Sequence, residues 1–120
     1  MIDARTQSAV RAAYGLALLC IPGRMIALLD VPDDAPGAGI VVQLLGARHV
    51  AQAALTLGWP TRGVTAVGVV ADTLHCATDI GTAAALPRWR RAAAIDAVLA
   101  ALFACVGAQA RQTRDTRAKS

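Results

Sequence analysis

The chain has 120 residues, enough for one domain, and its composition is unusual for a soluble one. Hydrophobic residues make up 56% of it and charged residues only 17%, whereas a typical soluble domain is about 25% charged. The net charge of +4 comes with few aromatic residues and no nucleic-acid-binding motif, which argues against a nucleic-acid partner. Most apolar residues are Ala, Leu and Val, which favours closely packed membrane helices over the alternative, an Ala-rich soluble bundle.

The first predicted membrane span covers residues 8–29. Pro22 interrupts it, and Arg11 and Arg24 lie too close together for the segment between them to cross ~30 Å of hydrocarbon. Two interpretations are open. Both arginines reach out from one longer span, or a helix ends near Pro22 and continues, kinked, along the membrane interface.

Three further apolar segments predict the remaining spans, at residues 40–59, 64–86 and 91–110. The acidic segment 30–39, rich in Pro and Gly, is predicted to be a solvated loop. Trp59 and Trp89 stand at span ends, where indole rings anchor helices to the interface. The prediction is therefore all-α, an antiparallel bundle of four transmembrane helices within residues 1–110, followed by a polar, basic tail at 111–120 that is mobile beyond its first turn.

Four spans place both termini on one side of the membrane. Lys and Arg are more numerous near the span ends on that side, namely at Arg5, Arg11, Arg62, Arg111, Arg114, Arg117 and Lys119. The opposite side holds the acidic loop together with Arg24, Arg88, Arg90 and Arg91. Because basic residues are retained on the cytoplasmic side, we predict a multi-pass protein of the inner (plasma) membrane with cytoplasmic termini.

The predicted third span carries three ionisable residues on one face, because Asp72, His75 and Asp79 are spaced three and four apart. A charge at mid-membrane costs about 2.5–3.5 kcal/mol on insertion scales, so these groups need partners from other helices. At 1.5 Å per residue, Arg48, Asp79 and Asp96 fall in a similar layer, which predicts that Arg48 lies between the two carboxylates. The predicted buried polar cluster is Arg48, His49, Gln52, Asp72, His75, Asp79 and Asp96.

Several roles for this cluster remain open. It could fix the rotation of the helices, or form a proton or small-ligand path through Asp72, His75 and Asp79. A metal site at His49, His75, Asp72 and Asp79 and a bis-histidine haem at His49 and His75 are the less favoured alternatives. We assign no cofactor and no catalytic residue, because neither a nucleophile–base pair nor a phosphate-binding loop is present.

Three segments of the chain, LGARHVAQAAL, VADTLHCATDIG and RWRRAAAIDAV, resemble a group of small actinobacterial four-helix membrane proteins. More distantly they are similar to the DoxX-like superfamily of compact four-helix membrane proteins. The resemblance covers about residues 8–108 and implies a four-helix bundle and, as in some DoxX relatives, association with redox partners. It carries over no active-site residue, and Cys20, Cys76 and Cys105 lack the spacing of a redox pair.

Two functions are therefore weighed. The first is an accessory or scaffold subunit that binds lipid, a membrane protein or a second copy of itself through small-residue helix faces. The second is a membrane enzyme or a proton or small-ligand carrier built on the buried Asp, His and Arg residues. A dry bundle with every polar group paired would favour the first. An enclosed, water-connected cavity lined by Asp72, His75, Asp79, Arg48 and His49, or a bound metal or lipid, would favour the second.

Overall fold

The computed structural model describes residues 2–32 and 34–120, and all regular structure within them is helical. The elements in chain order are α1 (Ala4–Cys20), α2 (Pro22–Leu28), α3 (Ala38–Gly58), α4 (Arg62–Ala85), the short 3₁₀ helix η1 (Pro87–Trp89) and α5 (Arg90–Lys119). The predicted all-α class is confirmed for these residues. A loop does separate α2 from α3, but it is shorter than the predicted 30–39, because α3 already begins at Ala38, and it buries Val31 and Ala35; residue 33 lies outside the described residues.

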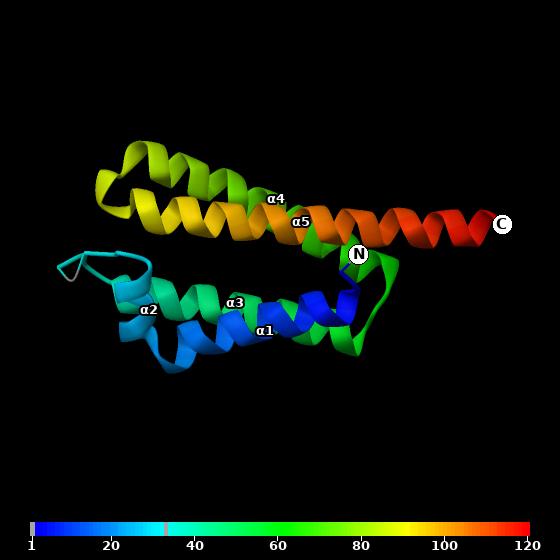
Figure 1. The fold of residues 1–120 in the computed structure, drawn as a ribbon, viewed down its shortest axis with the longest axis horizontal. Coiled ribbons are helices and arrows are strands. Elements are labelled where there is room, and N and C mark those ends of the chain that lie inside the picture. Colours follow the sequence, from blue (N-terminus) through cyan, green and yellow to red (C-terminus); the bar gives the residue numbers. More distant parts are fainter. Residues whose placement is uncertain (1, 33) are drawn as a thin grey trace.

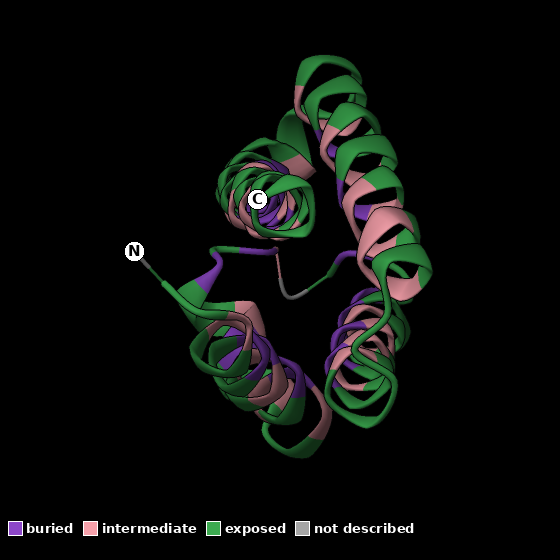
Figure 2. Ribbon diagram, turned by 90° about the vertical axis from the view of Figure 1, so that its right-hand side faces the viewer, coloured by how far each residue is buried: buried purple, intermediate pink, exposed green. Residues whose placement is uncertain are grey.

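The long helices form two closely packed pairs, α1 with α3 and α4 with α5 (Figure 1). Viewed end-on, the four rods surround a common axis (Figure 2). The molecule is elongated, at 56 × 28 × 21 Å. The turn from α3 to α4 and both chain termini lie towards one end, here called the terminal end. The loop between α2 and α3 lies with η1 at the other end, here called the loop end.

The segment predicted as the first span is not one straight helix. α1 ends at Cys20 and α2 begins at Pro22, with an angle of 108° between the two. Proline suits this position, because its missing N–H is not needed in the first turn of a helix and its fixed φ matches a helix start. The bend corresponds to the kinked interpretation of residues 8–29, and an unbroken span there is wrong.

The basic tail at 111–120 was predicted to be mobile, but α5 continues through it to Lys119. Sequence and contacts both explain the difference. No Gly or Pro follows Gly107 to stop the helix. Arg114 Nη1 also donates to the carbonyl of Pro60 at 3.0 Å, and Arg62 pairs with Asp115 at 3.1 Å. These contacts fasten the tail helix to the turn between α3 and α4.

Helices α1 and α3 approach each other closely at Gly15 and Gly46. A Cβ atom added at Gly46 would lie 2.7 Å from the carbonyl oxygen of Gly15 and 2.9 Å from Cβ of Leu18. A Cβ atom at Gly15 would lie 2.9 Å from Cβ of His49. Small residues permit such backbone contact between membrane helices. The contact fixes His49 against α1, in the centre of the bundle.

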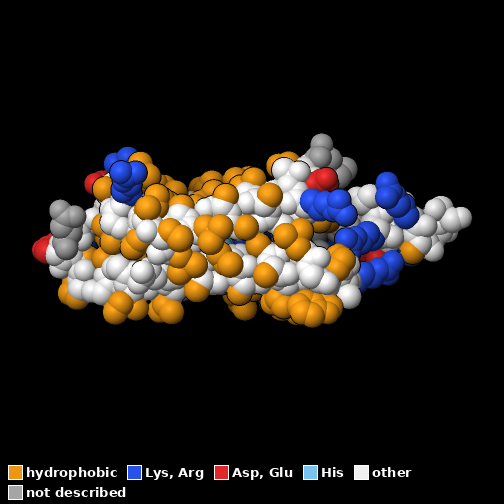
Figure 3. Space-filling model, turned by 90° about the horizontal axis from the view of Figure 1, so that it is seen from below, with side chains coloured by type: hydrophobic (Ala, Val, Ile, Leu, Met, Phe, Trp, Pro, Cys, Tyr) orange, Lys and Arg blue, Asp and Glu red, His pale blue; other side chains and the backbone are white. Residues whose placement is uncertain are grey.

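The bundle has a hydrophobic core that includes Leu18, Leu29 and Val42, but unlike a typical soluble protein it also buries several charged residues and exposes many large apolar ones. The outer surfaces of α3, α4 and α5 expose large apolar side chains, among them Ile40, Leu44, Val67, Val70, Leu74, Ile80, Val98 and Leu102. The buried polar residues are Ser8, Arg11, His49, Asp72, Asp79 and Asp96. Figure 3 shows the charged side chains at the two ends of one face and hydrophobic side chains along its middle. This arrangement is typical of a protein whose solvent is lipid.

Two helical segments are long and apolar enough to cross a membrane, α3 and Pro87–Lys119. The bent pair α1–α2 makes a third if it is counted as one span. Helix α4 is not among them, although its 24 residues could extend over about 36 Å. Its two buried acids, Asp72 and Asp79, lower its hydropathy. The structure therefore has two or three candidate spans and is compatible with a membrane protein.

Ion pairs tie the acidic loop to the arginines that follow α4. Arg91 pairs with Asp30 at 3.1 Å, and Arg88 pairs with Asp34. The hydrogen bond from Arg88, together with its charge, holds the pKa of the Asp34 carboxyl below its usual value. The acidic loop therefore neutralises part of the positive charge of the arginines between α4 and α5.

Candidate functional site

The buried polar side chains form two groups along the bundle. The arginine cluster consists of Arg11, Arg48, Gln52 and Asp72. The acidic cluster consists of His49, His75, Asp79 and Asp96. The first group lies towards the terminal end and the second towards the loop end, as the positions of their residues along α1, α4 and α5 require.

Asp72 is the centre of the arginine cluster and is only 1% exposed. Arg11 Nη1 and Nη2 donate to its two carboxylate oxygens at 2.9 and 2.6 Å, which is a bidentate pair. Arg48 Nη2 donates at 3.1 Å, and Gln52 Nε2 donates at 3.3 Å and also reaches the carbonyl of Gly68. With four donated hydrogen bonds and two positive charges, this carboxylate is fully compensated.

The predicted position of Arg48, between Asp79 and Asp96, is wrong: Arg48 pairs with Asp72 instead. Counting residues from a span end gives the depth of a side chain, but it does not give the rotation of the helix that carries it. The same reasoning missed Arg11, which was taken as a charge at the end of a span and is only 4% exposed. The spacing of the residues could have located Arg11. Four residues of α1 are spaced three or four apart and so share one face of the helix, and the structure buries all of them: Ser8, Arg11, Gly15 and Leu18.

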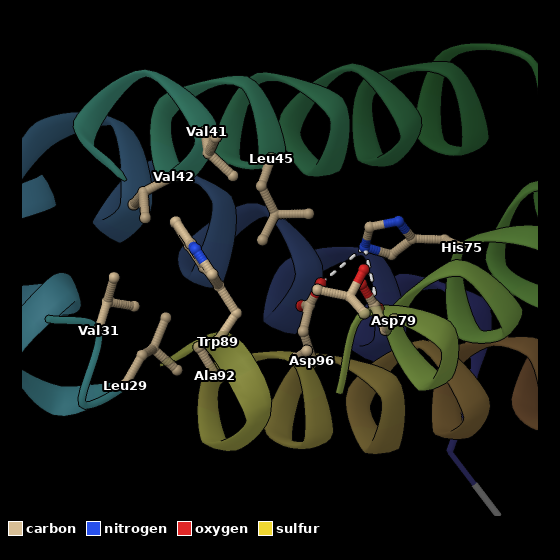
Figure 4. A pocket seen from close by; sticks show the side chains of 12 residues that line it. Leu29, Val31, Val41, Val42, Leu45, His75, Asp79, Trp89, Ala92 and Asp96 are labelled. Atoms are coloured by element: carbon tan, nitrogen blue, oxygen red, sulfur yellow. Dashed lines mark hydrogen bonds and ion pairs between the residues drawn. The ribbon is translucent and has the colours of Figure 1, made fainter. Parts of the chain in front are cut away.

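The acidic cluster brings together residues from α3, α4 and α5. Figure 4 shows three of them, His75 and Asp79 of α4 and Asp96 of α5. His75 of α4 points towards both carboxylates, with its Nε2 2.6 Å from Asp96 Oδ2 and 3.4 Å from Asp79 Oδ2. From α1, the Tyr14 hydroxyl donates to Asp96 Oδ1 at 3.4 Å. His49 of α3 completes the cluster, with Nε2 4.0 Å from Asp96 Oδ1. Asp79 and Asp96, predicted to share a layer, are therefore neighbours.

This second cluster is poorly satisfied. His49 is 0% exposed, yet neither of its ring nitrogens has a hydrogen-bond partner among the described residues. Asp79 Oδ2 is likewise buried without one. Within residues 2–32 and 34–120, no arginine or lysine forms an ion pair with Asp79 or Asp96. Both available arginines are used by Asp72. Among the described residues, Asp79 and Asp96 therefore have histidines beside them, with the Tyr14 hydroxyl also on Asp96, but no arginine or lysine.

Aromatic rings separate the two clusters. The guanidinium carbon of Arg11 lies 4.1 Å from the centroid of the Phe103 ring, which is a cation–π contact. The same ring lies 5.9 Å from that of His49, and Tyr14 meets His49 edge-on at 5.1 Å. Neither Tyr14 nor Phe103 was predicted to belong to the site. The sequence indicated their role only in that each is the single residue of its type in a chain with few aromatic residues.

A pocket of about 260 Å³ opens onto the acidic cluster. His75, Asp79 and Asp96 line its inner end, and Trp89, the last residue of η1, faces Val42 across it (Figure 4). The other walls are almost entirely apolar and come from the α2–α3 loop, α3, α4 and α5: Leu29, Val31, Val41, Leu45, Thr82, Ala92 and Ala93. The pocket thus joins an apolar chamber to an acidic end.

The geometry decides between the cofactor alternatives. A haem between His49 and His75 is not accommodated, because the carboxylate of Asp96 lies between the two imidazoles, where the porphyrin would have to be. The metal-ligand set His49, His75, Asp72 and Asp79 is not assembled either, since Asp72 lies in the arginine cluster. The aspartate beside His75 and Asp79 is Asp96, and not Asp72 as that set proposed. Comparison with protein-family models, with curated proteins and with solved structures finds no match to this chain.

Proposed function

We propose that the protein is a multi-pass membrane protein that binds a cation inside its helical bundle, at the acidic end of the pocket. In this proposal the bent pair α1–α2, α3, α4 and α5 all cross the bilayer. Helix α4 does so in spite of its charges, because Asp72, His75 and Asp79 face inwards and α4 presents apolar residues such as Val67 and Leu74 to the lipid. This is the carrier hypothesis raised above for the buried polar residues.

The observation that carries the proposal is the uneven distribution of buried charge. The arginine cluster holds two positive charges and one negative, whereas the acidic cluster holds two carboxylates. Buried carboxylates without an arginine or lysine partner are costly in a medium of low dielectric constant, and they are compensated by protonation, by a charged histidine or by a bound cation. A bundle built only for rigidity gains nothing from placing both arginines on one acid. A site that admits a cation does gain, because the carboxylates stay available.

The shape of the pocket supports the same conclusion. A ligand site is usually an apolar cavity with a few polar groups that fix the orientation of the ligand. Here the polar groups are grouped at one end, beside Asp96, and the walls around Val42 and Leu45 are apolar. The pocket therefore fits either a bare cation or a small amphiphile with a cationic head and an alkyl tail.

Octylammonium is the probe that tests this function. It should raise the melting temperature of the detergent-solubilised protein in the presence of a chelator, because a ligand that binds only the folded state adds about 2.7 kcal/mol at a hundred times its Kd. Asp96→Asn should abolish the shift, whereas Asp115→Asn, in the exposed part of α5, should leave it unchanged. Octanol, which has the same tail without the charge, is the ligand control. Equal shifts with octanol and octylammonium would contradict the proposal.

The second candidate function is the accessory subunit that binds lipid or a membrane partner through its helix faces. It is supported by an outward-facing apolar groove between α4 and α5, about 370 Å³ in volume, lined by Cys76, Ile80, Ala83, Ala94, Ala97, Val98 and Ala101. The small residues in this groove would let another helix or an acyl chain approach closely. This function is the one that remains if the acidic cluster binds neither octylammonium nor a metal ion.

A further inference from the structure

We propose that the cation is a first-row divalent transition metal ion, bound by His75, Asp79 and Asp96, with His49 as the fourth ligand. This inference rests on the proposed function and names the ligand class of the same site. It differs from the metal set considered from the sequence, which included Asp72 and lacked Asp96.

The ligand atoms are already close to a coordination geometry. One atom each from His75, Asp79 and Asp96 lies within 4.8 Å of the others. In a tetrahedral site with bonds of about 2.0 Å, neighbouring ligand atoms are about 3.3 Å apart. His75 Nε2 and Asp79 Oδ2 are 3.4 Å apart, which fits this spacing. The 2.6 Å contact of His75 with Asp96 needs to open by less than 1 Å when an ion enters.

His49 is an independent observation that points to a ligand. It is 0% exposed, both of its ring nitrogens lack partners among the described residues, and Nε2 is directed at Asp96 from 4.0 Å. A buried imidazole normally has a hydrogen-bond partner, and an unpartnered one needs an explanation. An ion placed among His75, Asp79 and Asp96 would supply that partner. His49 cannot retreat, because Gly15 and Tyr14 of α1 pack against it.

The donor set selects the kind of ion. Two imidazole nitrogens with two carboxylate oxygens suit Zn²⁺, Mn²⁺, Fe²⁺ or Co²⁺, whereas Ca²⁺ and Mg²⁺ prefer sites made of oxygen atoms alone. Two carboxylates also balance a double positive charge, so the loaded site is neutral in the interior of the bundle. The apolar pocket beside Asp79 and Asp96 gives the ion an entry path.

Cobalt binding provides the test, and the sequence makes it unusually selective. The chain has only two histidines, His49 and His75, and both belong to the proposed site. The protein is purified without a polyhistidine tag, with its three cysteines replaced by alanine, and is stripped with a chelator. We expect one Co²⁺ per chain, the visible absorption of four-coordinate Co²⁺, and perturbation of both histidines in ¹⁵N spectra of the metal-loaded protein.

Variants then identify the ligands. Asp96→Asn and His49→Gln should each weaken Co²⁺ binding by at least the roughly 10–100-fold typical of changes around a metal site, whereas Asp34→Asn in the exposed loop should have no effect. Retention of full affinity in Asp96→Asn, or histidine resonances that do not respond to Co²⁺, would overturn the inference. If the variants do not fold, the histidine spectra of the parent protein decide alone.

The outcome separates this inference from the function on which it rests. Octylammonium binding without Co²⁺ binding would disprove the metal site and leave a site for organic cations. If the protein binds neither Co²⁺ nor octylammonium, the proposed cation-binding function is disproved as well. Co²⁺ binding without octylammonium binding would support the inference and restrict the function to metal ions.

Discussion

Asp72 and Asp96 are both buried aspartates in the same bundle, and their surroundings differ in kind. Asp72 accepts two hydrogen bonds from Arg11 and further ones from Arg48 and Gln52. Asp96 instead has His75, Tyr14 and, at 4.0 Å, His49 beside it. Arg11 and Arg48 both bind Asp72, so we infer a structural role for Asp72. Asp96 has no arginine partner among the described residues, and we infer that its carboxylate can bind a ligand.

The role of Arg11 at Asp72 can be measured directly. Arg11→Leu leaves Asp72 buried without its bidentate partner, so we expect a loss of about 3–5 kcal/mol in the free energy of unfolding. Arg48→Leu should cost less, since the Arg48 side chain is 27% exposed and donates one hydrogen bond to Asp72. Thermal unfolding in detergent is the measurement, with Arg114→Leu as the surface control. Replacing Arg11 and Asp72 together by leucine should restore much of the loss, and equal melting of the Arg11 and Arg48 variants would disprove this ranking.

At the scale of the helix, the contact between α1 and α3 decides where the site can form. Gly46 and Gly15 bring the two backbones together, and His49, one turn along α3, is held against α1 as a result. The bend before α2 then turns the chain so that Leu29 and Val31 reach the pocket. The site therefore depends on helix packing at some distance from its own ligands.

Substitution of Gly46 tests this dependence. Gly46→Ala places a methyl group 2.7 Å from the carbonyl oxygen of Gly15, which the backbones cannot accommodate without moving apart. We expect a destabilisation of about 1–3 kcal/mol, as in overpacked cores. Gly81→Ala in α4 is the matched control, because an added Cβ there meets nothing within 4 Å and alanine favours the helix. Similar melting temperatures for the two variants would show that the α1–α3 contact is not tight.

The helices and the depth of their polar residues could be predicted from the sequence, but their rotation and partners could not. Run length and composition predict the helices, and the rise per residue predicts that Asp79 and Asp96 share a layer. Which face of α3 meets which neighbour depends on packing between distant segments, so Arg48 was given the wrong acid. Arg11 was missed because an arginine near a span end has an ordinary explanation, and only the pairing across helices shows it to be buried.

On the scale of the whole molecule, the two ends differ in the number of their basic residues and in how these are paired with acids. At the loop end, Arg88 and Arg91 are paired with acids of the loop. At the terminal end, Arg111 and Arg117 stand on the last turns of α5, beyond the apolar part of that helix. With Arg11 buried, the terminal end still has more basic residues than the loop end, which favours a cytoplasmic location for it.

Labelling of single cysteines tests this orientation. In a background with Cys20, Cys76 and Cys105 replaced by serine, Asp34→Cys should react with a membrane-impermeant maleimide on intact cells. Arg117→Cys should react only after permeabilisation if the tail helix faces the cytoplasm as predicted. The opposite pattern would mean that the protein is inserted the other way round, and equal labelling in intact cells would argue against a spanning topology.

The separation of the arginine and acidic clusters gives the bundle an internal electric dipole along its long axis, with the negative pole nearer the loop end. If that end faces outwards, a cation moving from outside to Asp96 travels with the resting potential through part of the membrane field. Each elementary charge gains up to about 2.3 kcal/mol per 100 mV for a full crossing. Occupancy of the acidic cluster should then increase as the cell interior becomes more negative, so that an energised membrane would load the protein and a depolarised one would release its ion.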